Sequence, residues 1–168
     1  RIKDVYPDYE AIVYKERKYS WRQVYDRCTR FASALTKVGI GKGDVVSIMA
    51  ANTPELFEAH YSVPMTGGVV NTINTRLDTR TVAYILDHSD CKVFIVDRQF
   101  HNVAIDAIAQ VKRDIIVIDI DDKQADLGDI PSIGKLEYES FLQTGDEGFA
   151  WIRPDDEWQA ISLNYTSG

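Results

Sequence analysis

The sequence predicts an α/β protein with a mostly parallel, doubly wound sheet, helices on both faces and a small amino-terminal hairpin. From about residue 45 to residue 118, short apolar runs alternate with segments of helical periodicity, and this alternation predicts βαβ units. The runs are apolar at nearly every position, which is typical of parallel strands buried on both faces. The 168 residues suffice for one compact domain and are too few for two comfortable ones.

The amino-terminal part predicts a hairpin and then a long amphipathic helix. Residues 11–14 and 18–20 flank a charged turn, which predicts two antiparallel strands. Ser20, with Gln23 three residues further on, predicts a capping box at a helix start. Gly39 stands where the C-terminal cap is expected. The apolar residues between these caps recur at three- and four-residue spacing, and they are Trp21, Val24, Tyr25, Cys28, Phe31, Ala32, Leu35 and Val38.

The remaining strands and helices alternate. The expected strands are residues 45–50, 69–73, 92–96 and 115–118. Thr53 followed by Pro54 predicts the start of a helix over 54–66, which Pro64 should kink or end. Asp78 predicts the cap of the next helix. The apolar residues of that helix are Val82, Ile85 and Leu86, and those of the helix after it are Val103, Ala107, Ile108 and Val111.

Two regions near the carboxyl end are expected to differ from this pattern. Residues 119–148 are acidic and contain several glycines, so we expect a surface excursion with one short helix over 138–143. Residues 160–165 predict a last buried strand, followed directly by Thr-Ser-Gly. Because a buried parallel strand normally continues into a crossover helix, we expect residues 1–168 to be the N-terminal subdomain of a larger domain, cut at this point.

Charge and hydropathy exclude several classes of partner. The net charge of −7, with acidic residues spread along the chain, argues against general binding to nucleic acid or to anionic membranes. No run approaches the roughly 18 apolar residues of a membrane-spanning helix. The amino end also lacks the apolar core of a signal peptide, so a cytoplasmic location is expected.

The residue types that ligate metals are scattered. Cys28 and Cys91 are the two cysteines, and we expect both to be reduced and buried. His60, His88 and His101 are well separated, and a single near pair, His88 with Cys91, does not predict a zinc site. The acidic run Asp119, Asp121 and Asp122 is compatible with a magnesium or receiver-type phosphorylation site, but a solvated loop is the favoured interpretation.

Two glycine-containing segments are candidates for phosphate binding. Residues 39–44 follow a helix and precede a strand, whereas a nucleotide loop follows a strand and opens a helix, so we interpret them as a turn. Tyr165-Thr166-Ser167-Gly168 has the favourable context, because ligands of open α/β sheets bind beyond the carboxyl ends of strands. Hydroxyls and backbone N–H groups there suit phosphate oxygens. Taken alone, these four residues more often form an ordinary turn.

Several segments taken together, in order, resemble those of the AMP-forming adenylating enzymes, which include acyl-CoA synthetases, luciferases and the adenylation domains of peptide synthetases. The similar segments are 18–25 (KYSWRQVY), 38–46 (VGIGKGDVV), 52–55 (NTPE), 67–74 (GGVVNTIN) and 162–168 (SLNYTSG). The last of these resembles the start of the family signature Tyr-Thr-Ser-Gly-Thr-Thr-Gly-x-Pro-Lys-Gly. The resemblance covers nearly the whole chain, and the ordered set is far more specific than any one member.

The resemblance implies an acyl-CoA ligase that uses ATP with Mg²⁺ and then CoA to activate a carboxylic acid through an acyl-adenylate. It implies that Thr166, Ser167 and Gly168 contact the β- and γ-phosphates. Residues 61–65 look most like the branch that acts on medium- to long-chain fatty acids. The family's catalytic lysine, adenine-binding motif and magnesium-placing acid have no counterpart in these residues, so no catalytic or metal-binding residue is assigned and the isolated segment is expected to be inactive. A homodimer is a further possibility.

A second class of protein fits the same pattern of elements. A noncatalytic doubly wound module, either receiver-like or nucleotide-sensing, would use the acidic residues near Asp121 as its site. A receiver also needs an acidic pair at the end of an early strand, and none is found there. The ligase is therefore the favoured interpretation.

Overall fold

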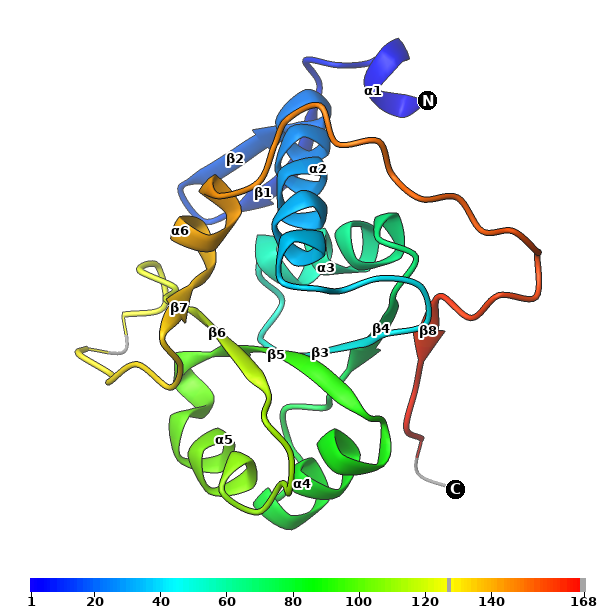
Figure 1. Ribbon diagram of the computed structural model, residues 1–168. Helices are drawn as coiled ribbons and strands as arrows, with labels where there is room; N and C mark the ends of the chain where they lie inside the picture. Colours follow the sequence, from blue (N-terminus) through cyan, green and yellow to red (C-terminus); the bar gives the residue numbers. More distant parts are fainter. Residues whose placement is uncertain (127, 167–168) are drawn as a thin grey trace.

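The computed structural model describes residues 1–126 and 128–166, and it places one parallel sheet between two layers of helices (Figure 1). The sheet has six strands in the order β7-β6-β5-β3-β4-β8, and every neighbouring pair is parallel. The strands are β3 (Val45–Met49), β4 (Val69–Thr72), β5 (Cys91–Asp97), β6 (Ile116–Ile120), β7 (Leu136–Glu137) and β8 (Ser162–Leu163). The doubly wound α/β fold expected from the sequence is confirmed.

The helices cover both faces of the sheet. In Figure 1, α2 (Trp21–Lys37), α3 (Pro54–Met65) and α6 (Tyr138–Gln143) lie above it. On the opposite face lie α4 (Thr79–His88) and α5 (His101–Ile108), the latter preceded by the short 3₁₀ helix η1 (Arg98–Phe100). Each layer has its own apolar core, one around Phe31 and Ile48 and the other around Leu86 and Phe94. The sheet is therefore buried on both sides, which explains its uniformly apolar strands.

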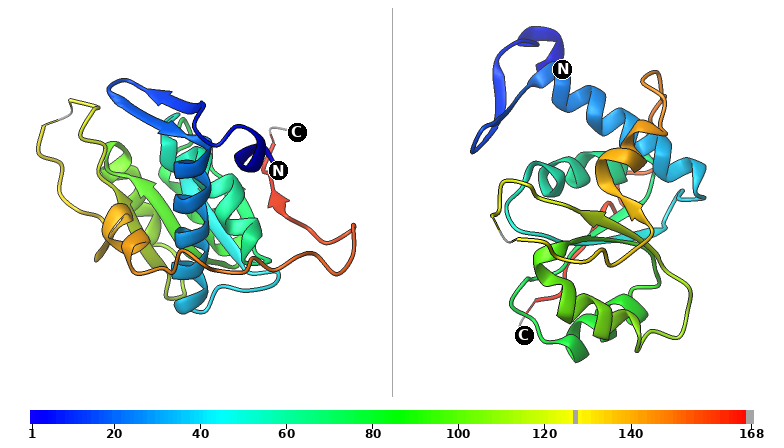
Figure 2. Two further views of the ribbon diagram at one scale, coloured as in Figure 1. Left: turned by 90° about the horizontal axis from the view of Figure 1, so that it is seen from above. Right: turned by 90° about the vertical axis from the view of Figure 1, so that its left-hand side faces the viewer.

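The amino-terminal hairpin is a separate, antiparallel element. It comprises β1 (Glu10–Tyr14) and β2 (Arg17–Ser20), is preceded by the single turn α1 (Ile2–Val5), and stands at one end of α2 (Figure 2). A third apolar cluster beneath it contains Val24, Cys28, Ala32 and Met65. The hairpin is thus fixed to the helical layer that contains α2 and α3.

The predicted helix signals correspond to real caps, with one exception. The Ser20 hydroxyl accepts a hydrogen bond from the Gln23 N–H at 3.3 Å, and the Gln23 side chain accepts one from the Ser20 N–H at 2.8 Å. Gly39 has φ +93°, as an αL cap requires. The Asp78 side chain accepts from the Thr81 N–H at 2.9 Å. Thr53 occupies the N-cap position of α3, but its buried hydroxyl makes no capping bond.

The prediction that residues 119–148 form a surface excursion is wrong at both ends of that segment. Strand β6 continues to Ile120, and Asp119 within it is 1% exposed. The Asp119 carboxylate accepts hydrogen bonds from the N–H groups of Ile133 and Gly134 at 2.9 and 2.8 Å, so it holds the returning chain beside β6. Strand β7, which was not predicted, then pairs with β6. The expected helix over 138–143 is confirmed, and its apolar side belongs to the core.

The predicted buried strand over 160–165 is also wrong in extent and burial. Only Ser162 and Leu163 pair with β4, at the edge of the sheet, and Ile161 is 53% exposed. An edge strand has a neighbour on one side only, so the apolar sequence did not lead to burial here.

The cysteines and histidines have different environments. Cys28 and Cys91 are free and buried, as expected. Burial raises the pKa of both thiols, that of Cys91 to about 11. His60 is exposed and its Nδ1 lies 2.8 Å from the Leu56 carbonyl oxygen of the same helix. In the described part of the chain, no helix has the length and apolar character to cross a membrane.

Candidate functional site

The topology directs attention to the carboxyl edge of the sheet around β3. The chain leaves β3 towards α3 on one face, whereas it leaves the neighbouring strands β4 and β5 towards α4 and α5 on the other (Figure 1). Strand β3 is therefore flanked by topological switch points. In open α/β sheets, such points are where ligands bind.

The predicted phosphate-binding residues begin at this edge. Thr166 follows β8, next to β4, and is exposed. It offers a hydroxyl and a backbone N–H, donors that suit phosphate oxygens. Ser167 and Gly168 lie outside the described residues. The structure thus brings one predicted site residue to the expected edge.

A buried polar chain holds β8 against the sheet. The hydroxyl of Ser47 on β3 donates to the Asn71 side-chain oxygen on β4 at 3.0 Å. The Asn71 side-chain nitrogen then donates to the Leu163 carbonyl oxygen on β8 at 2.9 Å. Both side chains are fully buried. Because buried polar groups are costly without partners, these bonds fix the position of the strand that precedes Thr166.

A cluster of three rings holds the next residue. Nδ1 of His88 lies 2.8 Å from the Tyr165 hydroxyl, and Tyr84, one turn earlier on α4, stacks on the His88 ring at 5.1 Å. The Tyr165 ring meets both of these rings edge-on. The pKa of Tyr165 is raised, mainly because the side chain is partly buried and to a smaller extent because Tyr84 lies nearby. The path of the chain into the predicted loop is therefore set by side chains of α4.

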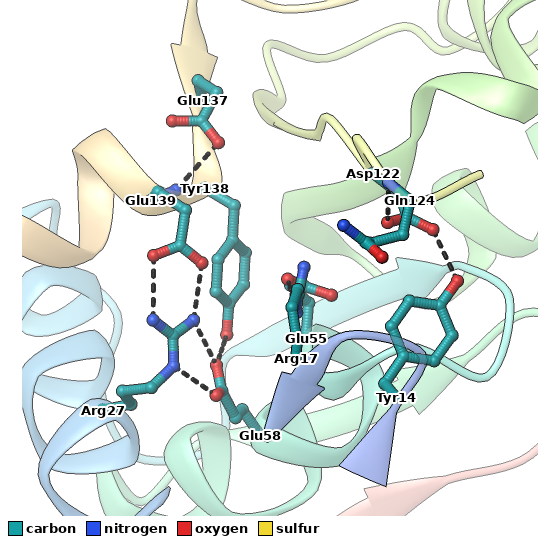
Figure 3. Close-up of polar contacts among 10 residues, drawn as sticks. All are labelled: Tyr14, Arg17, Arg27, Glu55, Glu58, Asp122, Gln124, Glu137, Tyr138 and Glu139. Atoms are coloured by element: carbon teal, nitrogen blue, oxygen red, sulfur yellow. Dashed lines mark hydrogen bonds and ion pairs between the residues drawn. The ribbon is translucent and has the colours of Figure 1, made fainter. Parts of the chain in front are cut away.

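Surface hollows also lie away from this edge. One of about 620 Å³ lies between β1 and the start of α3 and includes no predicted site residue. Another, of about 250 Å³, is lined in part by Asp97, Asp121 and Asp122. Asp121 pairs with Arg98 at 2.8 Å, and Asp122 accepts a hydrogen bond from the Tyr14 hydroxyl at 2.6 Å (Figure 3). These carboxylates are therefore engaged in structural contacts, and Asp119 is not part of a solvated loop.

A buried ionic cluster joins the three helices above the sheet (Figure 3). Arg27 on α2 contacts Glu58 on α3 at 2.5 Å and Glu139 on α6 at 2.6 Å. The Tyr138 hydroxyl donates to Glu58 at 2.9 Å. Burial raises the pKa of Glu58, although its bonds to Arg27 and Tyr138 act in the other direction. Since these charged groups are paired with one another, the cluster fixes the helical layer and offers no free acid or base.

Ser47, Asn71 and His88, which lie near the candidate site, were not predicted from the sequence. Asn71 could have been recognised from the sequence, because asparagine is depleted in strand interiors and needs a partner when buried. His88 could not, since its partner Tyr165 is distant in the sequence and only the fold brings the two together.

Fold and strand order define a class, a doubly wound α/β protein with topological switch points on both sides of β3. Comparison with known proteins gives the family. Residues 2–168 match the model of the AMP-binding enzyme family, and the chain belongs to this family of adenylating enzymes.

Similar proteins agree with this assignment. The chain is 43% identical to the peroxisomal acetate/butyrate–CoA ligase AAE7 of Arabidopsis thaliana, with 98% of this chain and 31% of that protein covered. It is 41% identical to the acetate–CoA ligase CCL3 of Humulus lupulus, and the match covers 100% of this chain and 31% of that protein. The crystal structure of the anthranilate–CoA ligase AuaEII with anthranoyl-AMP has the same fold, with a TM-score of 0.85, 21% identity and coverage of 99% and 31%. The chain thus spans about a third of the length of these relatives.

Proposed function

We propose that residues 1–168 are the N-terminal subdomain of an acyl-CoA ligase. The intact enzyme would use Mg·ATP to convert a carboxylic acid to an acyl-adenylate with release of pyrophosphate, and would then transfer the acyl group to CoA with release of AMP. The observation that carries this proposal is the family match over residues 2–168, together with Thr166 at the carboxyl edge of the sheet.

Within this reaction, the proposed role of the described residues is to bind and orient nucleotide. Thr166, Ser167 and Gly168 would donate hydrogen bonds to the β- and γ-phosphates. Oriented donors help such a transfer by stabilising charge that develops on oxygen. We propose no catalytic acid, base or nucleophile from this segment.

The proposed substrate is an aliphatic carboxylic acid. The sequence favoured a medium- or long-chain fatty acid, whereas the two relatives are named for acetate and butyrate. We therefore propose to compare acids of increasing chain length, from acetate through butyrate and octanoate to palmitate. A cytoplasmic location and a homodimer remain predictions, which fractionation of cells and sedimentation of the intact protein would test.

The first experiment is an acid-dependence assay of the intact protein that contains this segment. Over many turnovers we expect equimolar AMP, pyrophosphate and acyl-CoA, with acid, ATP, Mg²⁺ and CoA all required. Without CoA, pyrophosphate release should stop after the first half-reaction. Thr166→Ala should lower kcat/KM for ATP about tenfold to a hundredfold, the range for a hydrogen bond to a charged group. Thr36→Ala is the matched control, because that hydroxyl bonds to its own helix at the Ala32 carbonyl oxygen.

Two results would overturn the proposal. One is an intact protein that releases no AMP with any acid on the panel. The other is acid- and CoA-dependent AMP release by purified residues 1–168 alone, which we expect to be inactive. Nucleotide or phosphate binding without turnover by the intact protein would instead support the noncatalytic, nucleotide-sensing alternative.

A further inference from the structure

The ring cluster on α4 holds the residue that precedes the proposed phosphate loop. The pairing of β8 with β4 extends to Leu163, and Tyr165 lies two residues further on. From there, the contacts with His88 and Tyr84 direct the chain. Tyr165 also packs against the apolar cluster beneath the sheet, which contains Met49, Ile73 and Leu86. Tyr165 is therefore a fixed point immediately before Thr166.

The arrangement separates the two neighbouring side chains. Tyr165 is partly buried against α4, whereas Thr166 is exposed. If Tyr165 were released, the backbone that carries Thr166 would gain freedom, and a phosphate ligand would have to order it again on binding. Such ordering costs free energy. The contact between Tyr165 and His88 would then bear on nucleotide affinity.

Apolar packing alone does not explain the cluster. Tyr84 is 57% exposed, so its ring lies largely on the surface. The hydroxyl of Tyr165 meets the ring nitrogen of His88 at 2.8 Å, a distance and a pair of groups that constitute a specific bond. The Tyr165 O–H donates when Nδ1 carries no proton.

We propose that His88 is a positioning residue for Thr166, acting through Tyr165. This proposal rests on the proposed function, because it assumes that Thr166 binds a phosphate of ATP. His88 does not itself contact substrate in this scheme. Its effect is to lower the cost of ordering the backbone at Thr166.

The test is a steady-state comparison in the intact enzyme. His88→Phe keeps a ring for Tyr84 and Tyr165 to contact but removes the hydrogen bond. We expect KM for ATP to rise about 3- to 10-fold, the range for one neutral hydrogen bond, with kcat and KM for the acid changed less than twofold. Tyr165→Phe should have the same effect, and the double variant should be no worse than either single one.

Two further variants separate positioning from general stability. His88→Asn places an amide near the position of Nδ1 and should restore most of the ATP affinity. His101→Phe is the matched control, because it removes a comparable bond from Nδ1 of His101 to the Pro131 carbonyl oxygen at 3.0 Å, on a different helix. It should leave KM for ATP unchanged. If His88→Phe changed the KM values for ATP, the acid and CoA equally, or changed none of them, the proposal would be overturned.

Amide hydrogen exchange of the nucleotide-free protein distinguishes this inference from the proposed function. We expect residues 163–166 to exchange about 3- to 10-fold faster in His88→Phe than in His101→Phe. An intact protein without ligase activity, but with faster exchange, would refute the proposed function and leave the anchoring role of His88. Faster exchange with an unchanged KM for ATP in an active enzyme, or unchanged exchange, would refute the positioning role.

Discussion

At the residue scale, Arg27 is the side chain that pairs with carboxylates from two other helices. It holds Glu58, which is fully buried, and Glu139, which is 47% exposed (Figure 3). Arg27→Met should lower the free energy of unfolding by about 3–5 kcal/mol, because it leaves the Glu58 carboxylate buried without its partner. Urea titration measures this loss. Arg22→Met, which removes an exposed pair with Asp8, should cost less than about 1 kcal/mol.

The loss in Arg27→Met should depend on pH. Burial raises the pKa of Glu58, and removing Arg27 raises it further, because the hydrogen bond and charge of Arg27 favour the carboxylate. A carboxyl whose pKa is higher folded than unfolded destabilises the protein as pH rises above the unfolded value, about 4.3. The difference between variant and parent should therefore shrink as pH falls from 7 towards about 5. A pH-independent difference would contradict this account.

At the scale of elements, the packing of α6 on α2 depends on Gly145. A Cβ at this position would overlap the Arg30 carbonyl oxygen, which is backbone and cannot rotate away. Gly145→Ala should therefore destabilise the protein by about 3 kcal/mol, the upper end of the usual range for overpacking. Gly148→Ala is the matched control, because a Cβ there meets nothing within 4 Å. Thermal unfolding should show equal midpoints for this control and the parent.

The start of α2 gives a second prediction at the same scale. Ser20→Ala removes one half of the capping box and should cost about 1 kcal/mol, because the Gln23 N–H loses its acceptor. Ser132→Ala, in an exposed loop, should change stability by less than about 0.5 kcal/mol. Equal losses in the two variants, measured by urea titration, would show that the cap contributes nothing.

At the scale of the whole molecule, the two thiols report on opening of the structure. Burial raises the pKa of Cys28, and raises that of Cys91 to about 11, so at pH 8 almost no thiolate is present in the folded state. Alkylation of the peptides containing Cys28 and Cys91, followed by mass spectrometry, should be slow until urea unfolds the protein. Rapid modification of Cys28 in the native state would show that the apolar cluster beneath the hairpin opens readily, and rapid modification of Cys91 would show the same for the core that contains Leu86 and Phe94.

The sequence by itself determined the class of fold, the family, and the order of the elements from the amino-terminal hairpin to β6. Local signals were sufficient for these features, because each signal acts over a few residues. Examples are the capping box at Ser20, the αL glycine Gly39 and the apolar strands. The motif at Thr166 was likewise visible, because its context after a strand follows from the order of the elements.

Only the tertiary structure decided how distant polar residues are paired. Asp119 belongs to the sheet because the N–H groups of Ile133 and Gly134 satisfy its carboxylate, and no local pattern specifies that return of the chain. The bond between His88 and Tyr165 also joins residues far apart in sequence. Burial of a polar group is favourable only when a partner is present, and the fold alone places that partner.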